Sequence, residues 1–251
     1  FLGALLLLVV HRVARLIVRP ALAVGAMAFV AFLPMHIAMV SAVNNDSLAE
    51  LLMVVMLWQC LHVILHPPRH SLRPWFGLGL ITGLGLVTKS TVYGLLPMLG
   101  VTLILAWRDS LQHDPSARHA SRITFALLLP LLLLAVPWWL RNLAVYGGTD
   151  FLGLNRHEDI VLGQLRTAEF VAQQGWTSLG ARFITWTFRS FWGQFGWMSV
   201  LLDDRIYTAL LTLSAAVSVG ALWTLRRVWR QNNQAVRRAL FASADKSLPN
   251  S

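Results

Sequence analysis

The chain has 251 residues, of which 56% are hydrophobic and only 13% carry a charged side chain. Ordinary soluble domains have about 25% charged residues, so this composition, with a mean hydropathy of +0.60, excludes a water-soluble protein. The formal net charge is +10, but the arginines stand in short clusters between long apolar runs. A nucleic-acid-binding protein would gather them on one face, so no nucleic acid is expected as a partner. We therefore expect an integral membrane protein whose surroundings are membrane lipids.

Uninterrupted apolar windows predict an all-α, polytopic bundle of membrane helices. The windows are residues 21–43, 47–65, 75–107, 123–140 and 206–225. The third would be about 50 Å long as one helix, much longer than a hydrocarbon core of about 30 Å. We therefore divide it at Lys89, which Gly85 and Gly94 flank, because glycine weakens a helix. The result is six passes.

Residues 1–10 are apolar, but as a helix they rise only about 15 Å and lack the features of a signal peptide. We interpret them as the end of a truncated first helix. If successive passes cross the membrane in alternating directions, most of the 21 lysines and arginines fall in short loops on one side. Short basic loops face the cytoplasm, so Asp46, Lys89 and residues 141–205 are expected at the extracytoplasmic surface.

The predicted organisation has four parts. They are a transmembrane region (residues 1–140), an extracytoplasmic segment (141–205), the last transmembrane helix (206–230) and a polar, poorly ordered cytoplasmic tail (231–251). Within the second part, apolar residues recur at helical spacing from Val161 to Ala172 and again over residues 179–195, with Gly175 between the two stretches. Both predict amphipathic helices in the membrane interface. They are either a plain lid on the bundle or the roof of a cavity.

Ionisable side chains are costly at membrane depth, so each is a candidate for function. Asp46 is the first candidate, for a catalytic role. It follows Asn44 and Asn45, whose amides can bind hydroxyl groups. The alternative is that this polar run only caps the helix that follows.

Two cations are expected on the same surface. Lys89 is one of two lysines and could bind a phosphate, or it could extend to the lipid headgroups. Arg141 stands beside Asn142 and close to Tyr146, and its planar guanidinium suits a lipid phosphate; alternatively it is an interfacial anchor. We therefore assign substrate binding to Asn44, Asn45, Lys89, Arg141, Asn142 and Tyr146.

The remaining polar residues predict no further site. Cys60 is the single cysteine and lies in an apolar run, where we expect it only to pack. His36 is expected to be a core histidine, and the adjacent His157, Glu158 and Asp159 would diverge on a helix. We assign no metal site and no certain cofactor, and a divalent cation near Asp46 stays open.

Four segments in this order resemble the C-type (GT-C) polytopic glycosyltransferases. The resemblance is to the bacterial family-39-like group related to protein mannosyltransferases and lipid A aminoarabinose transferases. The segments are FLPMHIAMVSAVNNDSLAELL, GLITGLGLVTKSTVYGLLP, PWWLRNLAVYGG and SFWGQFGWMSVLLDDRIY.

This resemblance implies a hexosyl or pentosyl transferase of the bacterial cytoplasmic membrane, with its active face extracytoplasmic. It would move a sugar from a polyprenyl-phosphate donor to a lipid, glycan or protein acceptor. The family's main catalytic acid would lie upstream of residue 1, Asp46 looks like the second acidic residue, and Lys89 and Arg141 look like partners of the donor phosphate. The alternatives are a transporter or flippase for lipid-linked sugars, which should carry ionisable groups near the bilayer midplane, and a non-catalytic scaffold.

Overall fold

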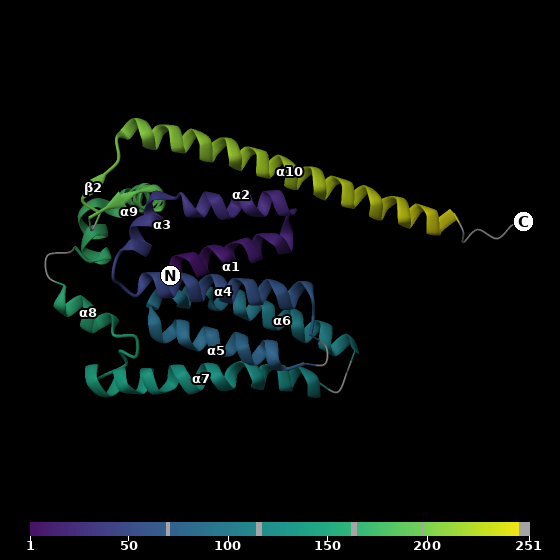
Figure 1. Cartoon of the computed structure of the whole chain (residues 1–251), viewed down its shortest axis with the longest axis horizontal. Helices are drawn as coiled ribbons and strands as arrows, with labels where there is room; N and C mark the ends of the chain where they lie inside the picture. Colours follow the sequence, from purple (N-terminus) through teal and green to yellow (C-terminus); the bar gives the residue numbers. More distant parts are fainter. Residues whose placement is uncertain (69–70, 114–116, 162–164, 197, 246–251) are drawn as a thin grey trace, which may run out of the picture. The chain divides into compact units, whose positions relative to one another are not determined.

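The computed structural model describes residues 1–68, 71–113, 117–161, 165–196 and 198–245, and they are almost entirely helical (Figure 1). The elements are α1 (Leu2–Ile17), α2 (Pro20–Ala31), α3 (Pro34–Ser41), α4 (Asp46–Leu65), α5 (Arg73–Thr88), the 3-10 helix η1 (Ser90–Leu95), α6 (Leu96–His113), α7 (Arg118–Tyr146), α8 (Leu154–Ile160), α9 (Thr167–Trp192), β1 (Gln194–Phe195), β2 (Val200–Leu201) and α10 (Asp204–Asp245). The chain divides into unit 1 (Phe1–Ile184) and unit 2 (Thr185–Ser251). The predicted all-α membrane class is confirmed.

Among the described residues, four helices are long and apolar enough to cross a membrane. They are Asp46–Leu65, Ser90–Gln112, Arg118–Tyr146 and Asp204–Gln231. A fifth candidate is the pair α2 and α3, which is bent by 63° just before Pro34, a residue that starts a helix well but cannot continue one. These correspond to five of the six predicted passes. The sixth, α5, has 16 residues and is therefore only about 24 Å long.

The long apolar window is divided at Lys89, as predicted. α5 ends at Thr88, and Lys89 has an extended backbone (φ −158°, ψ 141°) before η1 begins. The turn packs tightly, because a Cβ on Gly85 would lie only 2.8 Å from Cγ1 of Val92. A glycine at position 85 is therefore required for η1 to fold back onto the last turn of α5.

The core of unit 1 is centred on the contact between α5 and α7. The backbones approach closely because α5 carries small residues: a Cβ on Gly79 would lie 2.0 Å from the carbonyl oxygen of Leu127, and one on Gly83 would lie 3.1 Å from Cα of Leu131. Close contact through small residues is how membrane helices gain van der Waals attraction without a hydrophobic driving force. Large side chains fill the space around this contact, including Trp75, Met56, Leu78, Leu127 and Val92.

The contacts also fix the direction of each helix in unit 1. Residues 79 and 83 of α5 meet residues 127 and 131 of α7 in the same order, so these helices run parallel. α4 runs antiparallel to α5, because Asp46 meets Lys89 while Gln59 lies beside Gly77. The start of α4, the end of α5 and the end of α7 therefore share one end of the unit, which we call the Lys89 end (Figure 1).

The opposite end, which we call the Arg118 end, is basic. It holds the end of α4, the start of α5, the end of α6 and the start of α7. α1 runs parallel to α4, since Gly3 approaches Val40 and the guanidinium of Arg12 lies 6.0 Å from the ring of Trp58. The basic residues near this end are Arg15, Arg19, Arg73, Arg108, Arg118 and Arg122.

The segment after α7 differs from the prediction. α7 continues past residue 140 and ends at Tyr146. The first amphipathic helix begins at Thr167, whereas the prediction began it at Val161. Val161 follows the separate helix α8, which ends at Ile160, and residues 162–164 lie outside the described residues. The break at Gly175 is confirmed by its left-handed backbone (φ 80°), a conformation that glycine adopts readily.

Unit 2 contains a short hairpin that the sequence analysis did not predict. The expected helix over residues 179–195 ends at Trp192, and Gln194 and Phe195 pair antiparallel with Leu201 and Val200. The buried hydroxyl of Tyr207 stabilises the hairpin by donating to the carbonyl of Gly193 (2.6 Å).

The predicted C-terminal tail overlaps α10, which extends through Asp245, and residues 246–251 lie outside the described part of the chain. The last helix is therefore assigned further than the predicted bound at residue 230. The poor order and the cytoplasmic position of the tail stay predictions.

The contact between α5 and α7 gives a prediction that compares two glycines of one helix. Gly79→Ala should lower the free energy of unfolding by about 1–3 kcal/mol, because the new methyl group overlaps the backbone of α7. Gly77→Ala is the matched control, since its Cβ would meet only Nε2 of Gln59 at 3.8 Å. The control should gain up to about 1 kcal/mol from helix propensity. Denaturant unfolding in detergent micelles measures both, and equal effects would contradict the packing described.

Candidate functional site

An ion pair connects two helix ends at the Lys89 end of unit 1. Nζ of Lys89 contacts Oδ1 of Asp46, and the two side chains are only 28% and 19% exposed. Asp46 is the first residue of α4, where a carboxylate interacts favourably with the helix dipole, and Lys89 stands in the break after α5. Each charge compensates the other at a depth where an isolated charge would be costly.

The two asparagines before Asp46 position this ion pair. Oδ1 of Asn44 accepts a hydrogen bond from the backbone N–H of Asp46 (3.0 Å), and Nδ2 of Asn45 donates to the carbonyl of Thr88 (2.9 Å). The second bond joins the start of α4 to the end of α5 beside the ion pair. Although Asn45 is the N-cap residue of α4, its side chain does not cap the helix. Both amides therefore hold the loop in place, and their role in acceptor binding stays a prediction.

A second polar pair lies one helical turn further along α4. Nδ1 of His36 and Oε2 of Glu50 are 3.2 Å apart, and His36 is buried. The hydroxyl of Ser47 also donates to the carbonyl of Met39 (3.2 Å), which attaches α3 to α4. We expected His36 to be a core histidine, and the structure shows that its partner is Glu50. The signal for this pair was the spacing of Asp46 and Glu50, four residues apart and so on one face of α4.

Arg141 is surrounded by residues of its own helix. Nη1 donates to Oδ1 of Asn142 and to the hydroxyl of Tyr146, both at 3.0 Å. The guanidinium carbon lies 5.3 Å from the ring centre of Trp138 and 5.4 Å from that of Tyr146, within the range of cation–π attraction. Asn142, which is 1% exposed, is itself fixed by donating to the carbonyl of Phe151 (2.9 Å). The predicted grouping of Arg141, Asn142 and Tyr146 is thus present in the structure.

One hydrogen bond connects the part of α7 that carries Arg141 to the break that carries Lys89. Nε1 of Trp139 donates to the hydroxyl of Tyr93 in η1 (2.7 Å). Arg141 therefore lies at the same end of unit 1 as Asp46 and Lys89. Within the described residues, however, no hydrogen bond or ion pair joins Arg141 to either of them. The three charges form two neighbouring clusters, and the Trp139–Tyr93 bond was not anticipated from the sequence.

Asp150 anchors the loop that follows Arg141. Burial raises the pKa of this carboxyl, but hydrogen bonds from the backbone N–H groups of residues 153–156 outweigh burial, so the pKa lies below its ordinary value. One of these bonds, from Arg156 to Oδ2, is 2.9 Å long. The charged carboxylate thus holds the start of α8 near the Arg141 cluster, another contact that the sequence analysis missed.

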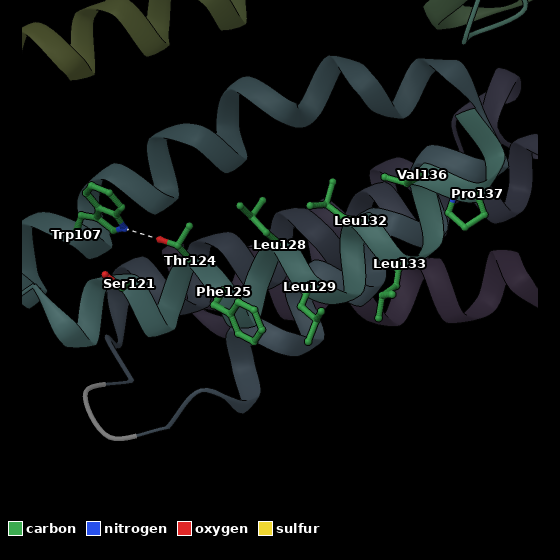
Figure 2. A pocket seen from close by; sticks show the side chains of 10 residues that line it. All are labelled: Trp107, Ser121, Thr124, Phe125, Leu128, Leu129, Leu132, Leu133, Val136 and Pro137. Carbon is green, nitrogen blue, oxygen red and sulfur yellow. Dashed lines mark hydrogen bonds between the residues drawn. The ribbon is translucent and has the colours of Figure 1, made fainter. Parts of the chain in front are cut away.

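An apolar pocket of about 700 Å³ follows one face of α7 (Figure 2). Ten residues line it: Trp107, Ser121, Thr124, Phe125, Leu128, Leu129, Leu132, Leu133, Val136 and Pro137. Trp107 from α6 closes one end and donates from Nε1 to Oγ1 of Thr124 (2.9 Å). The pocket ends at Pro137, one helical turn before Arg141.

Comparison with known proteins decides the family. Residues 1–140 match the family described as dolichyl-phosphate-mannose-protein mannosyltransferase, which is more than half of the chain. The chain belongs to this family. No curated protein and no solved structure matches it.

Membership of the mannosyltransferase family confirms the resemblance to GT-C enzymes and shows a membrane glycosyltransferase. The match contains Asp46 and Lys89 and ends immediately before Arg141. Two of the four similar segments lie inside it, the third begins inside it, and SFWGQFGWMSVLLDDRIY lies outside.

The depressed pKa of Asp150 predicts a pH dependence of local order. A carboxyl whose pKa is lowered by folding stabilises the fold above its unfolded pKa, and the stabilisation is lost as pH falls through the folded pKa. Hydrogen-exchange protection of residues 153–156 should therefore decrease in acid. Asp150→Asn should show the weakened protection already at neutral pH, whereas the exposed control Asp159→Asn should not. Protection that stays constant into strong acid would contradict this role.

Proposed function

We propose that this protein transfers a sugar from a polyprenyl-phosphate donor to a lipid, glycan or protein acceptor at the Lys89 end of unit 1. The observation that carries the proposal is the Asp46–Lys89 ion pair, which lies within the part of the chain that matches the mannosyltransferase family. A carboxylate and an amine held together at one end of a helical bundle are groups that this reaction needs.

The cations stabilise the leaving group. Transfer of the sugar leaves a lipid phosphate with added negative charge, and fixed positive charges near a low-dielectric surface stabilise it more than water does. Lys89 offers a compact ammonium group. The hydrogen bonds that the described residues make with Arg141 both use Nη1, so the edge formed by Nε and Nη2 can bind two phosphate oxygens.

Donor binding would change the state of Asp46. When a phosphate draws Lys89 toward it, the carboxylate of Asp46 loses its ion-pair partner. Asp46 can then orient an acceptor hydroxyl or assist its deprotonation.

A divalent cation is a separate question. It would have to compete with Lys89 for the carboxylate of Asp46. The described residues contain no group of three or more His, Cys, Asp or Glu side chains that could hold a metal ion. The donor set therefore does not fit a cation by itself, and no step of the mechanism is assigned to one.

The pocket along α7 supports a lipid-linked donor. It extends over residues 121–137, about 24 Å of helix, and its lining is almost entirely apolar. An isoprenoid chain in this pocket would bring its phosphate to the turn that carries Arg141, because the lining ends at Pro137, four residues before it. The lipid-binding surface and the phosphate-binding residue thus belong to one helix.

The charge distribution supports an extracytoplasmic active face. The Arg118 end carries basic residues in short loops, and such loops remain in the cytoplasm. The Lys89 end would therefore lie on the extracytoplasmic side, which in bacteria is the outer side of the cytoplasmic membrane. A transporter or flippase is the second candidate, but Asp46 and Lys89 lie at helix ends instead of near the middle of a span. The third alternative is a non-catalytic scaffold, whose charges would only anchor it in the lipid headgroups. The pairing of Asp46 with Lys89 between two helices disfavours it.

The proposed donor site can be tested in the full-length protein. Lys89→Ala and Arg141→Ala should each reduce transfer of a radiolabelled sugar from a polyprenyl-phosphate donor by at least about tenfold, because each loses a charge on the leaving phosphate. Arg15→Ala is the matched control, since it removes an exposed arginine from the opposite end. Equal membrane levels of all variants exclude misfolding. Wild-type rates in both site variants would remove the proposed site.

Orientation can be tested independently by cysteine labelling. In a Cys60→Ala background, Thr149→Cys places a thiol in an exposed loop after α7, and Gln112→Cys places one at the exposed end of α6. A membrane-impermeant maleimide should label position 149 in intact cells and position 112 only after permeabilisation. The reverse pattern would invert the proposed orientation.

A further inference from the structure

A second pocket lies at the Arg118 end of unit 1, away from the proposed site. Its volume is about 760 Å³, and α4, α5, α6, α7 and the segment after α4 all contribute to its lining. The polar and charged residues that line it are Thr102, Asp109, Ser110, Arg118, His119 and Arg122, together with Trp75. None of these residues belongs to the Asp46, Lys89 or Arg141 clusters, so the proposed glycosyl transfer leaves this pocket unexplained.

Two buried donors in this pocket are unsatisfied. Trp75 is 1% exposed and Ser110 is 6% exposed. Within the described part of the chain, neither Nε1 of Trp75 nor Oγ of Ser110 has a hydrogen-bond partner. Buried polar groups are nearly always paired, because leaving one unpaired costs about 1–3 kcal/mol. Two such donors lining one pocket indicate a bound group that accepts hydrogen bonds.

The charges that line the pocket indicate that this group is an anion. Arg118 and Arg122 come from the first two turns of α7, where the positive end of the helix dipole adds to their charge. Asp109 also lines the pocket, but two arginines against one carboxylate leave the lining positive.

The rest of the lining is apolar. Val63, Ile64, Leu105, Ala106 and Ile123 line the pocket beside its polar residues. The pocket thus combines donors and cations with a hydrocarbon-like wall, at the end of a membrane bundle. Basic pockets of this kind between membrane helices bind the headgroups of anionic lipids.

We propose that this pocket binds a phosphate group, carried either by an anionic phospholipid of the surrounding leaflet or by a soluble phosphate ester. Arg122 and Arg118 neutralise the phosphate, while Nε1 of Trp75 and the hydroxyl of Ser110 donate to its oxygens. This inference does not depend on the proposed glycosyl transfer, because it concerns the opposite end of the unit.

The central test uses Ser110→Ala, which removes the unsatisfied hydroxyl and almost no volume. Native mass spectrometry and titration of the detergent-solubilised full chain with phosphatidylglycerol should show an affinity about tenfold weaker than for the unsubstituted protein. The melting temperature without lipid should stay unchanged or rise, because the hydroxyl has no partner to lose. Ser121→Ala is the matched control: Ser121 is exposed, its hydroxyl bonds the carbonyl of Ala117, and it does not line this pocket.

A second pair of variants tests the charge. Arg122→Ala should weaken phosphatidylglycerol binding by at least about tenfold, whereas Arg108→Ala removes an exposed arginine from the same end without touching the pocket. Glycerol 3-phosphate and inorganic phosphate distinguish the two sources. Tight binding of the lipid alone assigns a headgroup site, and equal binding of the soluble probes assigns a soluble phosphate ester. No binding of any probe, or binding that Ser110→Ala and Arg122→Ala leave unchanged, overturns the proposal.

Discussion

A charge at the edge of a hydrocarbon layer needs a partner, and the pairing of Asp46 with Lys89 satisfies this requirement for both residues. The local structure around the pair follows from it. α4 begins at Asp46, α5 ends just before Lys89, and Asn45 joins the two ends through the carbonyl of Thr88. The break in the long apolar window therefore positions the charge of Lys89 directly, without a separate loop.

The packing of α5 supplies the rigidity that this arrangement needs. Gly79 and Gly83 allow α7 to approach α5, and Gly85 allows η1 to fold back over the last turn. The bond between Trp139 and Tyr93 then joins α7 to η1. The Lys89 and Arg141 clusters are thus held in place by close packing at glycines, by this aromatic pair and by the hydrogen bonds of Asn45 and Asn142.

The sequence predicted those features that depend on the cost of burying polar groups. The apolar windows, the break at Lys89 and the grouping of Arg141 with Asn142 and Tyr146 all have this origin. Periodicity was less reliable after α7, where Val161 proved to follow a separate helix and the stretch after Trp192 forms a hairpin. The hairpin depends on a contact between residues distant in sequence, the hydrogen bond from Tyr207 to Gly193, and no local sequence pattern predicts that pairing.

The sequence also could not reveal which buried groups lack a partner. Trp75 and Ser110 are ordinary residues in apolar helices, and only the assembled bundle shows that nothing among the described residues accepts their hydrogen bonds. The sequence also could not show that Glu50 pairs with His36, because their proximity requires the chain to turn back between α3 and α4. Site residues that act through tertiary contacts thus stay hidden until the helices are placed.

The length of α7 has a consequence for communication across the bilayer. Its 29 residues form one helix of about 44 Å, with Arg122 near one end and Arg141 near the other. Pro130 and Pro137 lie inside this length, and each removes a backbone hydrogen bond, so the helix can bend at two defined points between the two surfaces. Any coupling between a headgroup on the basic side and the guanidinium on the far side would have to pass through these two bends.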